Sequence, residues 1–315
     1  MARFQIMHQP ARWLYGQPYL LLMMTALFWG GNSIASRLAV SEVSPFVIVF
    51  YRWAIVCLLL IALNYKKVRA SWPVLKPKLP LLAGMATVGF TGFNAIFYVA
   101  GHHTSAINIG ILQGSIPVIV LLGAFLLYAT PVKPLQIVGT LVTIAGVIVV
   151  ASAGDIDRLL NLQFGYGDGL MMIACILYAS YTLALKRRPE VSGIVLMTVL
   201  AFFALITSIP LVAYEIASGE AQMPTGTGWL VILYITLFPS FLAQIFFMRG
   251  VELIGPGRAG VFVNLVPVFS AILAIVILNE SFLLFHGLAL ALVLGGIYIA
   301  ERQKAVPPVA PKPAS

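Results

Sequence analysis

The sequence predicts an all-α integral membrane protein of ten transmembrane helices, arranged as two inverted repeats of five helices with both termini in the cytoplasm. Three observations lead to this fold class. The chain is 61% hydrophobic, 9% charged and has a mean hydropathy of +1.00, which is too apolar for a soluble domain of this length. Its two halves carry helix-breaking residues at matching positions. Its basic residues fall almost entirely on one side of the predicted membrane.

The individual spans follow from the length of the apolar runs. A hydrocarbon layer of roughly 30 Å needs about 20 apolar residues per helix. The runs are continuously apolar and do not alternate as barrel strands do, so we expect helices. The predicted spans are 19–39, 45–64, 79–101, 106–128, 134–152, 166–186, 192–214, 227–249, 258–278 and 282–301.

The segments outside the spans complete the organisation. No small-residue cleavage site follows the first apolar run, so we expect the first span to remain in the mature protein. Trp13 and Tyr15 precede it, where amphipathic aromatic residues favour the headgroup level. The proline-rich end of the chain lacks apolar periodicity and is predicted to be disordered. The predicted units are a cytoplasmic segment at 1–18, the first repeat at 19–152, an external linker at 153–165, the second repeat at 166–301 and a cytoplasmic tail at 302–315.

The net charge of +9 reflects membrane topology. With a cytoplasmic N-terminus, the 19 basic residues all lie on the inner side except Arg37, Arg52 and Arg158. This asymmetry is what the positive-inside rule requires. We therefore expect a multi-pass protein of the inner membrane, with the lipid bilayer and a small-molecule substrate as partners and no nucleic acid.

Matched helix breakers indicate an internal duplication. Pro117 and Pro267 lie 150 positions apart, and the same offset pairs Gly110 with Gly260. Each half holds five spans, an odd number, so the second half enters the membrane in the opposite sense. Paired breaks in inverted halves indicate a transport site near the bilayer midplane.

Each predicted break lies beside an amide side chain. Pro117 displaces the carbonyl of Gln113, and Pro267 that of Val263. Freed carbonyls in a membrane need a partner. Gln113 and Asn264 lie about one turn before the two prolines. Each amide side chain either binds substrate or forms a hydrogen bond to a neighbouring helix, and such a hydrogen bond contributes about 1 kcal/mol.

Aromatic and polar side chains form further candidate substrate contacts. Trp29 and Asn32 share one face of the first span, and their matches in the sixth span are Tyr178 and Tyr181. Aromatic residues on membrane helices also pack or face lipid, so both interpretations stay open. The other candidates are Asn94 and Tyr98 in the third span and Phe238 and Gln244 in the eighth.

Three charged or titratable residues are candidates for attraction of substrate or for gating. Arg52 lies within the second span, where a charge is costly unless it faces water, snorkels or is paired. It either attracts an anionic group or has a structural role. His102 and His103 end the third span and are candidates for a proton-linked gate. Because no acidic residue lies deep in a span, we expect facilitated diffusion or coupling without a buried acid.

Catalysis and cofactor chemistry are not expected. Cys57 and Cys175 fall inside spans and are interpreted as small buried apolar residues. We predict no cofactor, metal site or catalytic residue. Gly165-Tyr166-Gly167-Asp168 matches the signature of intramembrane aspartyl proteases, but that chemistry needs a second carboxylate. A scaffold protein leaves the matched prolines unexplained.

Several short motifs resemble one transporter superfamily. Phe28-Trp29-Gly30-Gly31-Asn32 leading to Arg37, and Ser44-Pro45-Phe46 leading to Arg52, resemble the opening helices of the drug/metabolite transporter superfamily, EamA type. Further resemblances are Ile116-Pro117, the Gly139 to Gly146 spacing, Pro267, Glu280 and Gly295-Gly296. One departure is Thr130, which stands in the first half where the second half has Glu280.

The resemblance implies ten helices in two inverted repeats and export of small metabolites or amino acids. Within the superfamily the chain is similar to exporters of aromatic amino acids. We therefore expect a carrier, not an enzyme, that exports aromatic and other apolar amino acids or similar metabolites by alternating access. The alternative is a multidrug exporter of organic cations. Exporters of that kind in this superfamily are usually short four-helix proteins with a glutamate in the membrane, and this chain has neither feature.

Overall fold

The computed structural model describes residues 13–155, 157 and 165–302. Within these ranges all regular structure is helical, and nine helices are long and apolar enough to cross a membrane. A tenth long helix, α2 (Pro18–Leu38), is less apolar because it carries small and polar residues such as Gly30, Asn32 and Ser33. These three residues are buried against other helices, so α2 is adapted to packing inside the bundle.

The observed helices follow the predicted spans closely. One difference is α3, which continues past residue 64 to Ala70 and ends with Lys67 and Arg69 in its last turn, where basic residues are favourable at a helix C-terminus. Another is the third span, which begins at Trp72. The first half contains α3 (Pro45–Ala70), α4 (Trp72–Leu75), α5 (Leu79–Ala86), η2 (Thr87–Gly92), α6 (Phe93–Gly101), α7 (Ala106–Gln113), α8 (Ile116–Tyr128) and α9 (Pro134–Ala151). The second half contains α11 (Tyr166–Ala184), α12 (Gly193–Ala217), α13 (Gly226–Ile235), η4 (Thr236–Leu242), α14 (Ala243–Ile254), α15 (Pro256–Val261), η5 (Phe262–Leu265), α16 (Val266–Leu278) and α17 (Leu284–Glu301).

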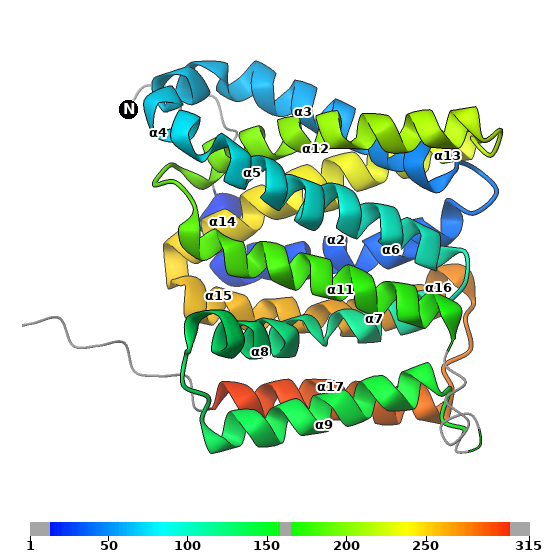
Figure 1. Cartoon of the computed structure of the whole chain (residues 1–315). Coiled ribbons are helices and arrows are strands. Elements are labelled where there is room, and N and C mark those ends of the chain that lie inside the picture. Colours follow the sequence, from blue (N-terminus) through cyan, green and yellow to red (C-terminus); the bar gives the residue numbers. More distant parts are fainter. Residues whose placement is uncertain (1–12, 156, 158–164, 303–315) are drawn as a thin grey trace, which may run out of the picture.

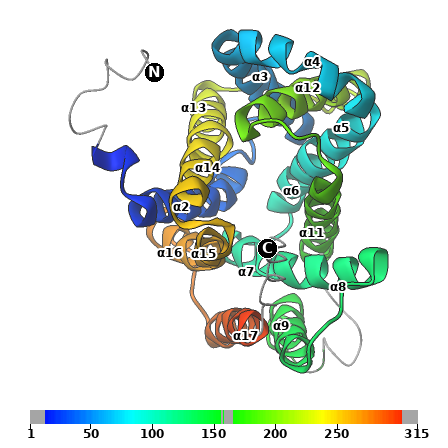
Figure 2. The same ribbon diagram turned by 90° about the vertical axis from the view of Figure 1, so that its left-hand side faces the viewer.

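The long helices run side by side in one bundle (Figure 1). We call the end at which α2 begins and α17 ends the terminal end, and the opposite end, where α2 is followed by α3, the distal end. Figure 2 views the bundle from the terminal end and shows the helices arranged around a centre, with α9 and α17 paired at one side. The two halves interleave, because α3 packs on α12, α2 on α14 and α16, and α11 on α6.

The α9–α17 pair depends on glycine at its crossing point. A Cβ on Gly139 would lie 2.3 Å from the carbonyl oxygen of Gly296, and a Cβ on Gly296 would lie 2.5 Å from that of Gly139. The two backbones therefore approach as closely as in other small-residue contacts between membrane helices. This contact joins the last helix of each half.

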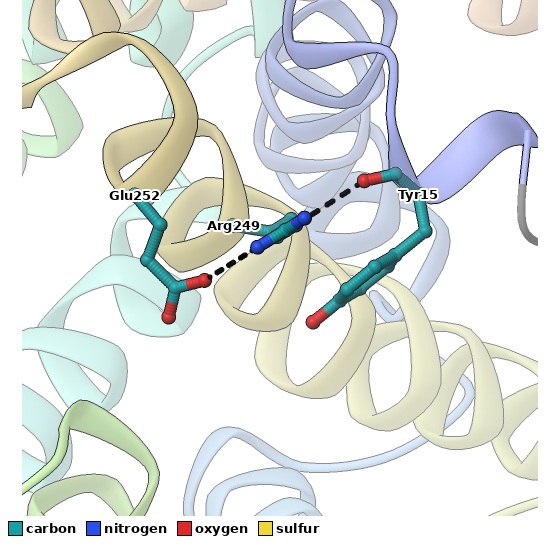
Figure 3. Close-up of polar contacts among 3 residues, drawn as sticks. All are labelled: Tyr15, Arg249 and Glu252. Atoms are coloured by element: carbon teal, nitrogen blue, oxygen red, sulfur yellow. Dashed lines mark hydrogen bonds and ion pairs between the residues drawn. The ribbon is translucent and has the colours of Figure 1, made fainter. Parts of the chain in front are cut away.

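A short segment before α2 is held at the terminal end by Arg249 of α14 (Figure 3). The Nε of Arg249 donates to the carbonyl of Tyr15 over 3.2 Å, and the guanidinium lies 4.7 Å from the centre of the Tyr15 ring. Glu252 accepts from Arg249 Nη1 over 3.0 Å. The predicted headgroup position of Trp13 and Tyr15 stays a prediction. Residues 1–12 of the N-terminal segment, most of the 153–165 linker including Arg158, and the tail from 303 onward lie outside the described residues.

Candidate functional site

Helix breaks occur at matching positions in the two halves. In the first half α7 ends at Gln113 and α8 begins at Ile116, with Pro117 in its first turn. In the second half the chain passes through the 3₁₀ segment η5 before α16 begins, again with proline, Pro267, in the first turn. Proline is tolerated there because the first amides of a helix have no partner within it. Both breaks therefore take the form of a new helix start.

A second matched pair of irregular segments was not foreseen from the sequence. The π-helical segments η2 and η4 interrupt the third and eighth spans, and they begin at Thr87 and Thr236, 149 positions apart. Such segments occur frequently at functional sites. In η2, a Cβ on Gly89 would lie 2.3 Å from the Cβ of Tyr181, so glycine allows α11 to approach closely.

The breaks and the π-helical segments surround a central cavity of about 160 Å³. Helices of both halves line it. The predicted residues in its lining are Trp29, Asn32, Arg52, Asn94, Gln113, Pro117, Tyr178, Tyr181, Gln244, Asn264 and Pro267. The lining residues that were not among the predicted site residues are Trp53, Gly89, Phe90, Phe93, Gly114, Ile116, Met197, Pro239, Ser240, Val263 and Val266.

Four predicted site residues lie elsewhere. Tyr98 is fully buried behind Arg52, where its hydroxyl accepts from Arg52 Nη1 over 2.8 Å and donates to Asn32 over 3.0 Å. Phe238 lines a separate apolar groove between α2, α13 and α16. His102 and His103 follow α6 at the distal end.

Arg52 is the charged centre of the cavity wall. Its Nε donates to Ser240 Oγ over 2.8 Å and its Nη1 donates to Asn94 Oδ1 over 2.7 Å. With 6% of its surface exposed, it is buried, yet all its partners are neutral. Among the described residues the one salt bridge joins Arg249 and Glu252, and Nη2 of Arg52 has no hydrogen bond. A buried cation without an anionic partner is costly, so an anion that enters the cavity is stabilised there.

The polar lining residues divide into those that join helices and those that do not. Gln113 donates to Ser33 Oγ of α2 over 3.2 Å, and the indole nitrogen of Trp29 donates to the carbonyl of Pro239 over 3.1 Å. The remaining polar groups have no side-chain hydrogen bond with the described residues and are available to a ligand. These groups belong to Tyr178, Tyr181, Gln244 and Asn264, and the buried indole N–H of Trp53 also lacks a partner among the described residues.

Aromatic rings form one wall of the cavity. Trp53 stacks on Phe90 with ring centres 4.8 Å apart and an angle of 11°. Phe90 in turn contacts Tyr181, and Tyr178 contacts both Tyr181 and Phe93. Such rings bury apolar and aromatic surface well. The wall therefore suits a solute with an apolar body, and Arg52 beside it suits a solute with an anionic group.

Acidic residues join the two halves at the distal end. Glu280 accepts from the amides of Ala106 and Ile107 at the start of α7, over 2.8 and 3.0 Å. Glu215 accepts from the amide of Val47 over 2.9 Å, from that of Phe46 and from Ser44 Oγ at the start of α3. These carboxylates occupy helix N-termini, where negative charge is favourable.

The remaining distal groups include Asp168 and the two histidines. Asp168, the acid of the protease-like motif, accepts from Thr104 and Asn108 and so contributes to packing between halves. The pKa of His102 is lowered by partial burial and by the nearby charges of His103 and Arg37. This direction favours the neutral imidazole at pH 7.

Comparison with known proteins agrees with the duplicated, membrane-embedded architecture. The chain is 26% identical over 299 residues to YetK, an uncharacterized transporter of Bacillus subtilis (strain 168), covering 93% of this chain and 89% of that protein. It is 28% identical over 293 residues to an uncharacterized transporter of Archaeoglobus fulgidus, covering 91% and 98%. A protein of known crystal structure shares the fold with a TM-score of 0.61 at 20% identity, covering 91% of this chain and 99% of that one.

The family assignment rests on two matched regions. The EamA-like transporter family matches residues 17–152 and again residues 165–301. Together these regions span most of the 315 residues. This chain therefore belongs to the EamA-like transporter family of the drug/metabolite transporter superfamily and is a multi-pass membrane transporter.

Proposed function

We propose that this transporter exports aromatic and other apolar amino acids, or similar small metabolites, across the inner membrane. The observation that carries the proposal is the position of Arg52, a buried cation without an anionic partner, beside the aromatic wall of the cavity. A carboxylate neutralises the guanidinium, and an apolar side chain buries its surface against the rings of Trp53, Phe90 and Tyr181.

The proposed topology has ten transmembrane helices in two inverted repeats, 19–152 and 166–301, joined by an external linker at 153–165. Support comes from the two matches of one family, the paired helix breaks and the paired π-helical segments. Basic residues such as Lys66, Lys67 and Arg188 lie at the terminal end, which supports a cytoplasmic location of this end under the positive-inside rule.

The proposed mechanism is alternating access around the cavity. The distal end is closed by the contacts of Glu215 and Glu280, so export requires these contacts to open after a solute has entered from the terminal end. The broken helices and the π-helical segments are the elements at which the cavity wall bends. Pro117 and Pro267 both line the cavity and are the proposed hinges.

We assign substrate binding to the polar lining side chains that have no hydrogen bond with the described residues. Asn264 and Gln244 offer amide groups, and Tyr178 and Tyr181 offer hydroxyls. Gln113 and Trp29 are assigned to holding the wall in shape. A multidrug exporter of organic cations is not favoured, because the charge of Arg52 repels cations and the described cavity lining contains no acidic residue.

The test is efflux of radiolabelled L-phenylalanine from liposomes that contain the purified protein. We expect efflux well above that of empty liposomes, at least tenfold slower efflux for Arg52→Gln, and unchanged efflux for Arg249→Gln as the matched surface control. Asn264→Ala, at a residue whose side chain has no hydrogen bond with the described residues, is expected to raise KM without loss of folded protein. Efflux equal to that of empty liposomes, or equal efflux by wild type and Arg52→Gln, contradicts the proposal.

A further inference from the structure

We infer that the cavity recognises the carboxylate of its substrate and not the ammonium group, so that apolar monocarboxylates without an amino group are substrates at least as good as amino acids. This inference rests on the proposed function, because it takes the central cavity as the substrate site. It concerns the charge of the substrate and the force that drives its export.

The first step is a count of charge in the cavity. Among the described lining residues Arg52 is the one formally charged side chain, and no Asp, Glu, Lys or His accompanies it. A bound monoanion brings the net charge of the occupied site to zero. A bound zwitterion leaves a net charge of plus one, because its ammonium has no carboxylate to pair with. Uncompensated charge inside a membrane protein is costly, so the monoanion is favoured.

The second step is the direction of the available hydrogen bonds. Arg52 Nη2 is a donor without an acceptor in the described part of the chain, and Arg52 lies in the same wall as Trp53. The indole N–H of Trp53 is a further donor without an acceptor among the described residues, but its nitrogen is fully covered, so a carboxylate reaches it only after a local adjustment of the wall. Both groups can only donate, and an ionised carboxylate can only accept. For an ammonium the lining offers neutral oxygens alone, such as those of Gln244 and Asn264.

The third step concerns the driving force. One transport cycle that carries a monoanion outward moves one negative charge across the membrane, whereas a zwitterion moves none. An inside-negative membrane potential therefore drives export of the monoanion and leaves export of the zwitterion unchanged. Such export needs no proton relay, which agrees with the neutral surroundings of Arg52.

The experiment compares three solutes that share a phenyl ring. L-Phenylalanine is a zwitterion, 3-phenyllactate carries a hydroxyl in place of the amino group and is a monoanion, and phenethylamine is a cation. Each is tested as a competitor of phenylalanine efflux from liposomes containing the full chain. We expect an inhibition constant for 3-phenyllactate equal to or up to tenfold below that of phenylalanine, and no competition by phenethylamine.

The potential provides a second readout. Protein-dependent efflux of 3-phenyllactate is measured at equal pH on both sides, with and without an inside-negative potassium diffusion potential. We expect a several-fold faster initial rate with the potential for 3-phenyllactate and no change for phenylalanine. Transport of phenylalanine without competition by 3-phenyllactate overturns the inference and leaves the proposed function intact. Competition by phenethylamine alone overturns both.

A substitution separates the role of the indole N–H from that of its ring. Trp53→Phe keeps an aromatic ring to stack on Phe90 and removes the donor. We expect a several-fold higher KM for both carboxylates with little change in kcat. Trp229→Phe is the matched control, because Trp229 contacts Tyr51 edge-to-face outside the described cavity lining. An unchanged KM in Trp53→Phe overturns the assignment of this donor.

Discussion

The distal and terminal ends of the bundle are joined in different ways. At the distal end, two carboxylates of the second half accept hydrogen bonds from the first turns of α3 and α7 in the first half. At the terminal end, the hydroxyl of Tyr128 donates to the carbonyl of Leu183 over 3.0 Å, and Lys186 lies 4.1 Å from the centre of the Tyr128 ring. Hydrogen bonds to an ionised group are roughly twice as strong as neutral ones, so the two halves are joined more firmly at the distal end.

The difference arises although the two halves share their broken helices. Glu280 closes the distal end, and Thr130 stands at the matching position near the terminal end. A neutral hydroxyl accepts hydrogen bonds from amides more weakly than a charged carboxylate does. Under the proposed mechanism, this single difference between the halves makes the terminal end easier to open than the distal end.

The largest expected effect follows from removing the acid with the most contacts. Glu215→Ala leaves the amides of Phe46 and Val47 and the hydroxyl of Ser44 without their acceptor. A buried donor left unsatisfied costs about 1–3 kcal/mol, so we expect a clearly lower midpoint of thermal unfolding. Glu220→Ala, at an exposed acid of the same end, is the control and is expected to leave the midpoint unchanged. Equal midpoints for the two variants count against the closing role of Glu215.

The second prediction concerns opening rather than stability. Glu280→Ala frees the start of α7. The reporter is a cysteine placed at buried Ile109, which reacts with a maleimide added from the distal end. We expect about tenfold faster modification, because losing about 1.4 kcal/mol of closing free energy makes the open state tenfold more populated. The background carries Cys57→Ala and Cys175→Ala. Glu280→Gln keeps an acceptor oxygen and is expected to give an intermediate rate. A rate equal to that of the parent contradicts the account.

The third prediction concerns a substitution that makes the contacts at the terminal end more like those at the distal end. Thr130→Glu places an acid at the matching position, which is exposed, so solvent screening limits the effect. We expect a cysteine at Asn264 to react about twofold more slowly from the terminal end. Thr130→Gln, with the same size and no charge, serves as control. Faster modification in Thr130→Glu is the opposite of what the comparison requires.

Much of the helical framework could be predicted because it depends on local sequence. The apolar runs indicated helices close to the observed bounds, and the first-turn position of Pro117 and Pro267 follows from the missing amide of proline. The π-helical segment η2 could not be predicted, because Thr87–Gly92 has no proline and packs against α11 and α12. Its counterpart η4 contains Pro239, which marks an irregularity but not its π-helical form.

The site was harder to predict, because a side chain's direction around a buried helix depends on its neighbours. Tyr98 shares a helix with Asn94, yet it supports Arg52 from behind while Asn94 lines the cavity. Trp53 was overlooked beside Arg52 because nothing in an apolar run marks which ring stacks on Phe90. The 149-residue offset relates η2 to η4 and pairs Thr91 with Ser240. A position-by-position comparison of the halves therefore shows a hydroxyl residue at the same place in both, which could have marked Ser240 as a candidate.

The smallest expected effect concerns pH. The lowered pKa of His102 means that the folded distal end favours the neutral ring, whereas the unfolded chain protonates near pH 6.5. Stability from this group is therefore present above pH 6.5 and is lost as pH falls below it. We expect His102→Gln to remove a small decline in the unfolding midpoint between pH 6.5 and 5 and to change nothing between pH 7 and 8. A change confined to pH 7–8 contradicts this sign.

The central claim, that the two ends open in alternation around the cavity, is tested most directly by spin-label distances across both ends of one protein. Labels at His103 and Glu220 report on the distal end, and labels at Lys67 and Arg188 report on the terminal end. The account predicts that saturating L-phenylalanine lengthens the distal distance and shortens the terminal one, and that Glu280→Ala shifts both in the same directions without substrate. Distances that change together at the two ends, or at neither end, contradict it.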